Sequence, residues 1–136
     1  MKKTIYLAGP IMGKTDEEAK GWRNEVKNGI YKSMCEFLDP MDRDYRGIED
    51  VEALAAEIVE NDKRDIMRSD ILLVNWTIPG TAGTAMEIHF AHLLGIPVVI
   101  VMKEGARISP WIRYHSTIIT NCFGGAMDYI AKQNNK

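Results

Sequence analysis

The sequence has little cysteine and no long apolar run, and both shortages restrict the kind of protein it encodes. Its 136 residues include two cysteines, Cys35 and Cys122, which do not form a CxxC pair. We therefore expect reduced thiols in a cytoplasmic protein. No apolar stretch approaches the ~20 residues of a membrane-spanning helix. The first residues, MKKTIYLAG, are better explained as a strand than as a signal peptide, so no membrane partner is expected.

The chain also lacks an excess of charge of either sign. Its 17 Lys and Arg residues nearly balance 19 Asp and Glu residues, which leaves a formal net charge of -2. A nucleic-acid-binding surface is usually basic, so a nucleic-acid polymer is not an expected partner. Hydrophobic residues make up 46% of the chain and charged residues 26%, as in ordinary globular proteins. We expect one domain over residues 1–136.

Short apolar runs alternate with helical patterns along the chain. DILLVNW (70–76) and PVVIVM (97–102) are apolar without alternation, which is typical of strands buried on both faces of a parallel sheet. We predict an α/β fold, a three-layer α/β/α sandwich with a five-stranded parallel sheet of the flavodoxin or Rossmann-like kind. The predicted strands are 3–9, 35–40, 70–76, 97–102 and 117–120, and the predicted helices are 15–34, 48–69, 83–95, 109–116 and 124–133.

Ligands of such sheets bind beyond the carboxyl ends of the strands, and a carboxylate stands close to one of these loops. On a helical wheel of residues 83–95, Glu87 falls within an apolar arc beside Ala91 and Leu94. We expect it to face the sheet, near free N–H groups at the start of the helix. An isolated buried carboxylate is costly. Glu87 is therefore either a catalytic group or a cap bonded to the amides of the GTAGTA loop.

A second carboxylate, Asp62, occupies an apolar stripe in the helix predicted at 48–69. The other members of this stripe, at helical spacing, are Val51, Ala55, Ile58 and Ile66. The alternative is that the helix turns Asn61 or Asp65 inward near its end.

Three further residues are aromatic or could bind a metal. Trp76 ends a predicted strand beside the ligand loops and is a candidate for stacking on a base. His89 and His92 have no ligand-like spacing, so we expect them to be exposed helix residues and predict no metal site.

Four segments resemble the nucleoside 2-deoxyribosyltransferase family in order and spacing, along nearly the whole chain. They are IYLAGP (5–10), PMDRDYRGI (40–48), ENDKRDIMRSDILLV (60–74) and GTAMEIHFAHLLGIPVVIV (83–101). The resemblance implies an enzyme that cleaves the N-glycosidic bond of a 2'-deoxynucleoside and passes the deoxyribosyl group to another base. Its partners would be a small nucleoside or nucleotide and a free base, and no cofactor is expected.

The resemblance also implies roles for single residues. Glu87 matches the nucleophile, Tyr6 the tyrosine that orients it, and Asp62 the acid that contacts the base and can protonate its leaving nitrogen. A carboxylate suits attack at an anomeric carbon, because the transition state is oxocarbenium-like. Further substrate-binding residues would come from the loops beside the site, namely Ala8, Gly9, Pro10, Ile11, Gly13, Trp76, Thr81 and Gly83.

One departure leaves the type of reaction open. Transferases of the family often carry an aspartate where this chain has Thr81, whereas the related deoxynucleoside 5'-monophosphate N-hydrolases tend to have a small hydroxyl residue. In those hydrolases a serine from a neighbouring subunit completes the phosphate site, and Ser116 is the candidate, with Lys14 also able to meet a phosphate. In transferases an asparagine from the neighbour binds the sugar, and Asn121 is the candidate. PMDRDYRGI and the END segment favour the transferase. The alternatives are a monophosphate N-hydrolase and a non-catalytic nucleotide-binding module.

The segment 108–121 predicts self-association. Trp111, Ile112, Arg113 and Tyr114 have the composition of an interface core. We expect at least a homodimer whose subunits share active sites, as the resemblance also implies.

Overall fold

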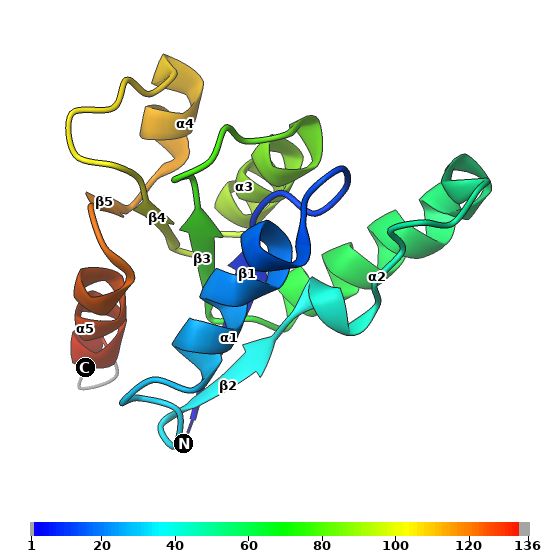
Figure 1. The fold of residues 1–136 in the computed structure, drawn as a ribbon. Coiled ribbons are helices and arrows are strands. Elements are labelled where there is room, and N and C mark those ends of the chain that lie inside the picture. The colour runs from blue at the N-terminus through cyan, green and yellow to red at the C-terminus, as the bar shows by residue number, and fades with distance from the viewer. Residues whose placement is uncertain (1, 134–136) are drawn as a thin grey trace.

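A computed structural model describes residues 2–133. At its centre lies one sheet of five parallel strands in the order β2-β1-β3-β4-β5 (Figure 1). Each strand falls inside its predicted range, and the predicted α/β sandwich is confirmed. The strands are β1 (Lys3–Ala8), β2 (Cys35–Leu38), β3 (Ile71–Asn75), β4 (Val98–Val101) and β5 (Ile118–Thr120).

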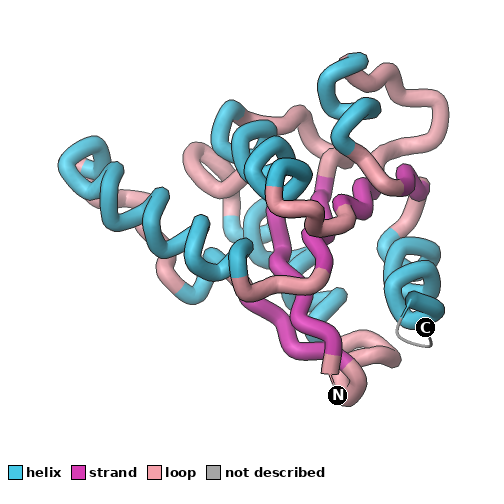
Figure 2. The backbone as a smooth tube through the Cα atoms, turned by 180° about the vertical axis from the view of Figure 1, so that it is seen from behind, coloured by secondary structure: helices cyan, strands magenta, loops and turns pink. Residues whose placement is uncertain are grey.

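Helices cover both faces of the sheet, as Figure 2 shows from behind. Successive side chains of a strand point to opposite faces, so β1 sends Ile5 and Leu7 to one core cluster and Tyr6 and Ala8 to the other. The first cluster packs against α1 and α5, and the second against α2, α3 and α4. The helices are α1 (Trp22–Lys27), α2 (Ala55–Met67), α3 (Ala82–Leu93), α4 (Pro110–His115) and α5 (Phe123–Gln133). None of the helices in this described part is long and apolar enough to cross a membrane.

Two helices differ from their predicted bounds. The helix predicted at 15–34 begins with a capping box of Thr15 and Glu18, continues as one π-helical turn (Glu17–Gly21), and ends with α1 at Lys27. Residues 28–34 form turns, because Gly29 disfavours a helix interior. The helix predicted at 48–69 starts as a 3-10 turn (Val51–Leu54) and becomes α-helical only at Ala55.

The strand order creates a crevice between two neighbouring strands. From β1 the chain moves to β2 at one edge, and from β2 it returns past β1 to β3. The loops that follow β1 and β3 therefore diverge at the carboxyl ends of these strands, which is where open α/β sheets bind ligands. A 3-10 turn after β2 (Pro40–Asp42) borders the same region.

Candidate active site

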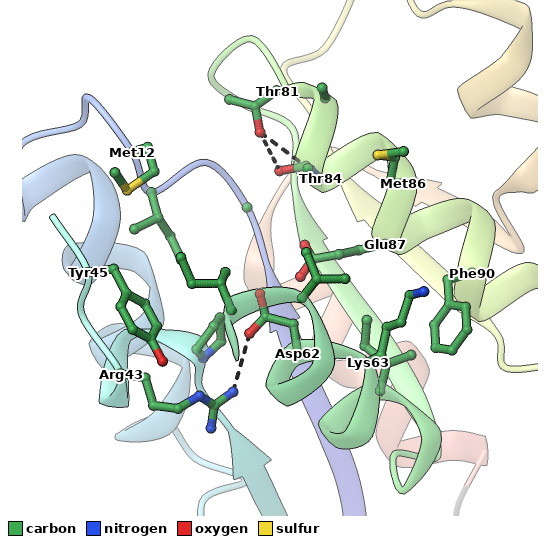
Figure 3. A pocket seen from close by; sticks show the side chains of 18 residues that line it. Met12, Arg43, Tyr45, Asp62, Lys63, Thr81, Thr84, Met86, Glu87 and Phe90 are labelled. Atoms are coloured by element: carbon green, nitrogen blue, oxygen red, sulfur yellow. Dashed lines mark hydrogen bonds and ion pairs between the residues drawn. The ribbon is translucent and has the colours of Figure 1, made fainter. Parts of the chain in front are cut away.

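A cavity of about 520 Å³ lies at this crevice. Its wall comes from the loop after β1, the segment after β2, one side of α2 and the first turns of α3 (Figure 3). The volume is in the range that small-molecule ligands occupy in proteins. Gly9, Ile11, Asp62, Thr81, Gly83 and Glu87, six of the residues predicted to form the site, line it.

Glu87 is held in the cavity by a tyrosine from the sheet. The Tyr6 hydroxyl donates a hydrogen bond to Glu87 Oε2 at 2.5 Å. Tyr6 is fully buried because it points from β1 toward α3, whereas Glu87 is half-buried and faces the cavity. The bond joins residues 81 positions apart in the sequence, so the fold assembles the pair that the resemblance implied.

The alternative role of Glu87, as a helix cap, belongs to another residue. Thr81 is the N-cap of α3, and its Oγ1 accepts a hydrogen bond from the backbone N–H of Thr84 at 3.3 Å. The wheel prediction also needs correction. Thr84, Ile88 and Ala91 are the buried residues of α3, whereas Leu94 is 46% exposed, so Glu87 faces the cavity and not a sealed core.

Burial raises the pKa of the Glu87 carboxyl to about 8, and the nearby Asp62 adds to the rise. The hydrogen bond from Tyr6 and the charge of Arg23 act in the opposite direction, since both favour the ionised form. Burial also raises the pKa of Tyr6, and Glu87 adds to this effect. Tyr6 therefore remains a proton donor to Glu87 at neutral pH.

The raised pKa makes stability depend on pH in a predictable direction. The ordinary value for a glutamate is 4.5. The folded protein therefore holds this proton more tightly than the unfolded chain does. The resulting contribution to the free energy of unfolding is complete below pH 4.5 and is lost as pH rises through about 8. Glu87→Gln keeps an acceptor for Tyr6 and cannot ionise. We expect the difference in Tm, variant minus wild type, to increase from about pH 5 to about pH 9; a constant difference in thermal melts would contradict the raised pKa.

Asp62 lies across the cavity from Glu87, on α2 (Figure 3). It is half-buried, and burial raises the pKa of its carboxyl, whereas Arg43 opposes the rise. Arg43 Nη2 donates to Asp62 Oδ1 at 3.2 Å and to Asp65 Oδ2 at 2.8 Å. Both expectations for this helix are therefore met in part, the one that placed Asp62 on the inward side and the one that placed Asp65 there. Asp65 turns inward and is 6% exposed, while Asp62 faces the cavity.

Several predicted site residues do not line the cavity. Ala8 and Pro10 are buried behind its wall, and Gly13 is an exposed turn residue whose φ of 75° favours glycine. Trp76 packs against the core on the α2 and α3 side. Its ring also lies so close to Gly80 that a Cβ atom added there would be only 2.1 Å from it. Trp76 is therefore a packing residue here and does not line the cavity.

The two residues expected to act across an interface also lie outside the cavity. Ser116 ends α4, where its hydroxyl donates to the carbonyl of Arg113 at 2.7 Å, and Asn121 is exposed after β5. Ser116 precedes β5 and Asn121 follows it, so the two lie toward opposite ends of that strand. Their roles in a partner's site remain predictions.

Side chains of the segment after β2 belong to the site although they were not predicted to do so. Arg43 and Tyr45 line the cavity, and Tyr45 donates to Glu57 Oε2 at 2.9 Å. Arg46 donates to the carbonyl of Lys14 at 2.9 Å and to Asp16 Oδ1 at 2.6 Å, which ties this segment to the loop after β1. All three residues lie inside PMDRDYRGI, the segment that carries part of the family resemblance. The resemblance of the whole segment therefore pointed to this place in the chain, but not to its single residues.

The three histidines of the chain lie together where α3 meets α4. His89 and His92 are exposed, as predicted, and His89 Nδ1 lies 2.9 Å from His115 Nε2. Within residues 2–133, no group of three or more His, Cys, Asp or Glu side chains is placed to hold a metal ion.

Taken together, the site offers two facing carboxyls, a tyrosine that donates to one of them and an arginine that pairs with the other.

Comparisons with known proteins identify the family and the fold of the chain. A sequence profile of the family described as nucleoside 2-deoxyribosyltransferase matches residues 5–134. No curated relative matches the chain by sequence.

Several solved structures share the fold. A 2-deoxyribosyltransferase from Bacillus psychrosaccharolyticus is 21% identical, with a TM-score of 0.74 over 93% of this chain and 91% of that one. A CMP N-glycosidase from Clostridium botulinum is 18% identical, with a TM-score of 0.61 over 97% and 99% of the two chains. A 2-deoxyribosyltransferase from Leishmania mexicana is 16% identical, with a TM-score of 0.64 over 96% and 97%.

Proposed function

This chain belongs to the nucleoside 2-deoxyribosyltransferase family, and on that premise we propose that it transfers the deoxyribosyl group of a 2'-deoxynucleoside to an acceptor base through Glu87. The observation that carries the proposal is the hydrogen bond of 2.5 Å from Tyr6 to Glu87 in a cavity that Asp62 also lines. A carboxylate that is oriented by a buried donor and faces a second carboxyl has the parts needed for covalent catalysis at an anomeric carbon.

Each group has a defined part in the proposed reaction. A Glu87 oxygen bonds to C1' of the sugar as the bond from C1' to the base nitrogen breaks, and Asp62 gives its proton to the departing base. An acceptor base then attacks C1' of the deoxyribosyl ester, returns a proton to Asp62 and releases Glu87. Tyr6 fixes the Glu87 carboxylate in the orientation for attack, which lowers the entropic barrier.

This mechanism requires a single proton on the pair of Glu87 and Asp62. Burial raises the pKa of both carboxyls, and charge repulsion adds to each rise, from Asp62 on Glu87 and from Asp65 on Asp62. Carboxyls that interact in this way lose their protons in coupled steps. At low pH both groups are protonated and no nucleophile is available, whereas at high pH no acid remains for the leaving base. The proposal therefore entails a bell-shaped dependence of kcat/KM on pH.

Hydrolysis of a 5'-monophosphate is the second candidate reaction. Water would replace the acceptor base, and the same nucleophile and acid would serve. Thr81 favours this candidate, because it places a hydroxyl at the cavity where transferases often have an aspartate. The fold similarity to a CMP N-glycosidase is compatible with it.

A product assay separates the candidate functions. The protein is incubated with deoxynucleosides and with their 5'-monophosphates, with and without a free acceptor base, and products are followed by chromatography. New nucleoside that forms only with the acceptor identifies a transferase, and free base that forms from monophosphates without it identifies a hydrolase. Ligand binding without base release, retained in Glu87→Ala, would instead identify a non-catalytic nucleotide-binding module.

An exposed apolar surface next to the cavity supports self-association. Its residues, here called the α3/α4 surface, lie on α3, its C-terminal cap and α4, and are Met86, Leu93, Leu94, Trp111 and Tyr114. Trp111 and Tyr114 are each 74% exposed, whereas Ile112, predicted for the interface, packs into the core of its own chain and is 6% exposed. Met86 also lines the cavity, so a second subunit that covers this surface would also cover the mouth of the cavity.

Mixing inactive variants tests whether the subunits share sites. One inactive variant is Glu87→Ala, and the other is Ser116→Ala or Asn121→Ala, whichever proves inactive. We expect activity to return when the chains of the two inactive variants exchange. Random exchange in a dimer places one intact site in half of the dimers, so roughly a quarter of wild-type activity returns. A fully active monomer in light scattering would contradict the shared site. A loss confined to monophosphates in Ser116→Ala would support the hydrolase, since only that substrate loses a phosphate contact.

A further inference from the structure

A fully buried arginine lies on the opposite side of β1 from the cavity wall formed by α2 and α3. Arg23 on α1 is 0% exposed. Its Nη2 donates to the carbonyls of Leu7 at 3.2 Å and Gly9 at 3.1 Å, and its Nε donates to the Leu7 carbonyl at 3.3 Å. Its Nη1 donates to the carbonyl of Ala19 at 2.6 Å. Arg23 thus holds the backbone where β1 passes into the loop that lines the cavity.

The charge of Arg23 is only loosely neutralised by its nearest carboxylate. Asp39 Oδ1 lies 3.5 Å from Arg23 Nε, whereas Asp39 Oδ2 lies 2.6 Å from Lys27 Nζ. Lys27 is therefore the closer partner of Asp39. Burying a guanidinium is costly, and simple anchoring of carbonyl groups does not require a permanent charge. The charge itself therefore calls for an explanation.

The charged and hydrogen-bonding groups that act on Glu87 come from three elements, two on its own side of the sheet or within it and one beyond β1. Tyr6 on β1 donates to it, Asp62 on α2 faces it as a like charge, and Arg23 on α1 contributes a permanent positive charge. Tyr6 and Arg23 lower the pKa of Glu87, whereas burial and Asp62 raise it. Arg23 is the cationic member of this set, and its position is fixed by its bonds to backbone carbonyls.

We propose that Arg23 is a positioning residue for Glu87, which fixes the end of β1 and supplies the positive charge that keeps this carboxylate available for attack. The inference rests on the proposed function in so far as it takes Glu87 to be the nucleophile. Two effects follow from one side chain. The carbonyl bonds hold the strand that carries Tyr6 and Gly9, and the charge offsets part of the penalty for ionising Glu87 in a buried site.

A titration of Glu87 tests the electrostatic effect without depending on catalysis. Carboxyl resonances of ¹³C-labelled protein are followed against pH in the wild type, Arg23→Gln and Arg23→Met, and Glu87→Gln identifies the Glu87 signal. Arg23→Met matches the length of the side chain, and Asp39 keeps its ion pair with Lys27 at 2.6 Å in this variant. We expect the Glu87 midpoint to move to higher pH in both variants and to stay near the wild-type value in Arg23→Lys.

Lys27→Gln is the matched control, because it removes the other cation from Asp39 without removing the charge near Glu87. We expect no change in its Glu87 midpoint. In activity assays, we expect kcat/KM of Arg23→Met to fall more at pH 6 than at pH 9, because a raised pKa reduces the ionised fraction of Glu87 most at low pH.

The outcomes separate the two claims. If the wild type releases no base from any substrate, the proposed function fails, and the titration still decides the inference on Arg23. If the Glu87 midpoint is the same in the wild type, Arg23→Met and Arg23→Gln, or if Lys27→Gln shifts it as far as Arg23→Met does, the inference on Arg23 is overturned.

Discussion

Glu87→Ala is expected to lower turnover by at least about a thousandfold, because covalent catalysis depends on one carboxylate oxygen and no neighbouring group can replace it. Asp62 lies across the cavity and is held by Arg43 at 3.2 Å, and Tyr6 is a proton donor with a raised pKa. Base release from a 2'-deoxynucleoside, followed by chromatography at saturating substrate, measures the loss.

Two further variants make this result specific to the carboxylate. Glu87→Gln keeps the shape and an acceptor for Tyr6, and we expect it to be nearly as inactive as Glu87→Ala. Glu60→Gln changes an exposed glutamate on α2 and should retain full activity. Circular dichroism and thermal melting establish that each variant is folded. Retention of one tenth of wild-type turnover by folded Glu87→Ala would refute its role as nucleophile.

Asp62→Asn is expected to slow the reaction by about a hundredfold or more for substrates with poor leaving bases, which is the range for loss of a general acid. Substrates whose base leaves readily without a proton should be affected far less. The asparagine keeps the shape and can still accept the hydrogen bond from Arg43. A plot of log kcat/KM against the pKa of the leaving base should therefore become steeper in the variant.

Asp65→Asn is the matched control, because Asp65 binds the same Arg43 nitrogen from the same helix but does not line the cavity. We expect any loss in this variant to be the same for all leaving bases. An equal loss for good and poor leaving bases in Asp62→Asn would mean that Asp62 only positions the substrate. A steeper plot in Asp65→Asn as well would assign the effect to the ion-pair network instead.

The strands could be predicted from the sequence because each is a short apolar run ended by turn residues. β3 and β4 are buried along their whole length, and no alternation was needed to find them. Glu87 could be singled out because a carboxylate in a mostly apolar helix is rare. Its partner Tyr6 was available only through the family resemblance, because a bond across 81 residues leaves no local pattern.

The faces of the helices could not be predicted, because they depend on the neighbours that each helix meets. The wheel of α3 gave an apolar arc, but the folded helix buries only Thr84, Ile88 and Ala91 and leaves Leu93 69% exposed. A single wheel cannot tell residues that pack in the core from residues that another subunit would cover.

The roles of two arginines were equally hard to predict from the sequence. Arg23 and Arg43 resemble ordinary surface cations in a linear reading, since such residues are rarely buried. Their roles arise from carbonyl and carboxylate groups that the fold brings to them from β1 and α2.

Mass spectrometry of a trapped intermediate shows directly whether Glu87 bonds to the sugar. The protein is incubated with a 2-fluoro-substituted nucleoside, whose fluorine slows breakdown of the sugar ester more than it prevents its formation. We expect a mass increase of one fluorodeoxyribosyl group, located on the peptide that contains Glu87 and absent from Glu87→Gln. Release of base from this substrate without any adduct, or an adduct on a different residue, would contradict it.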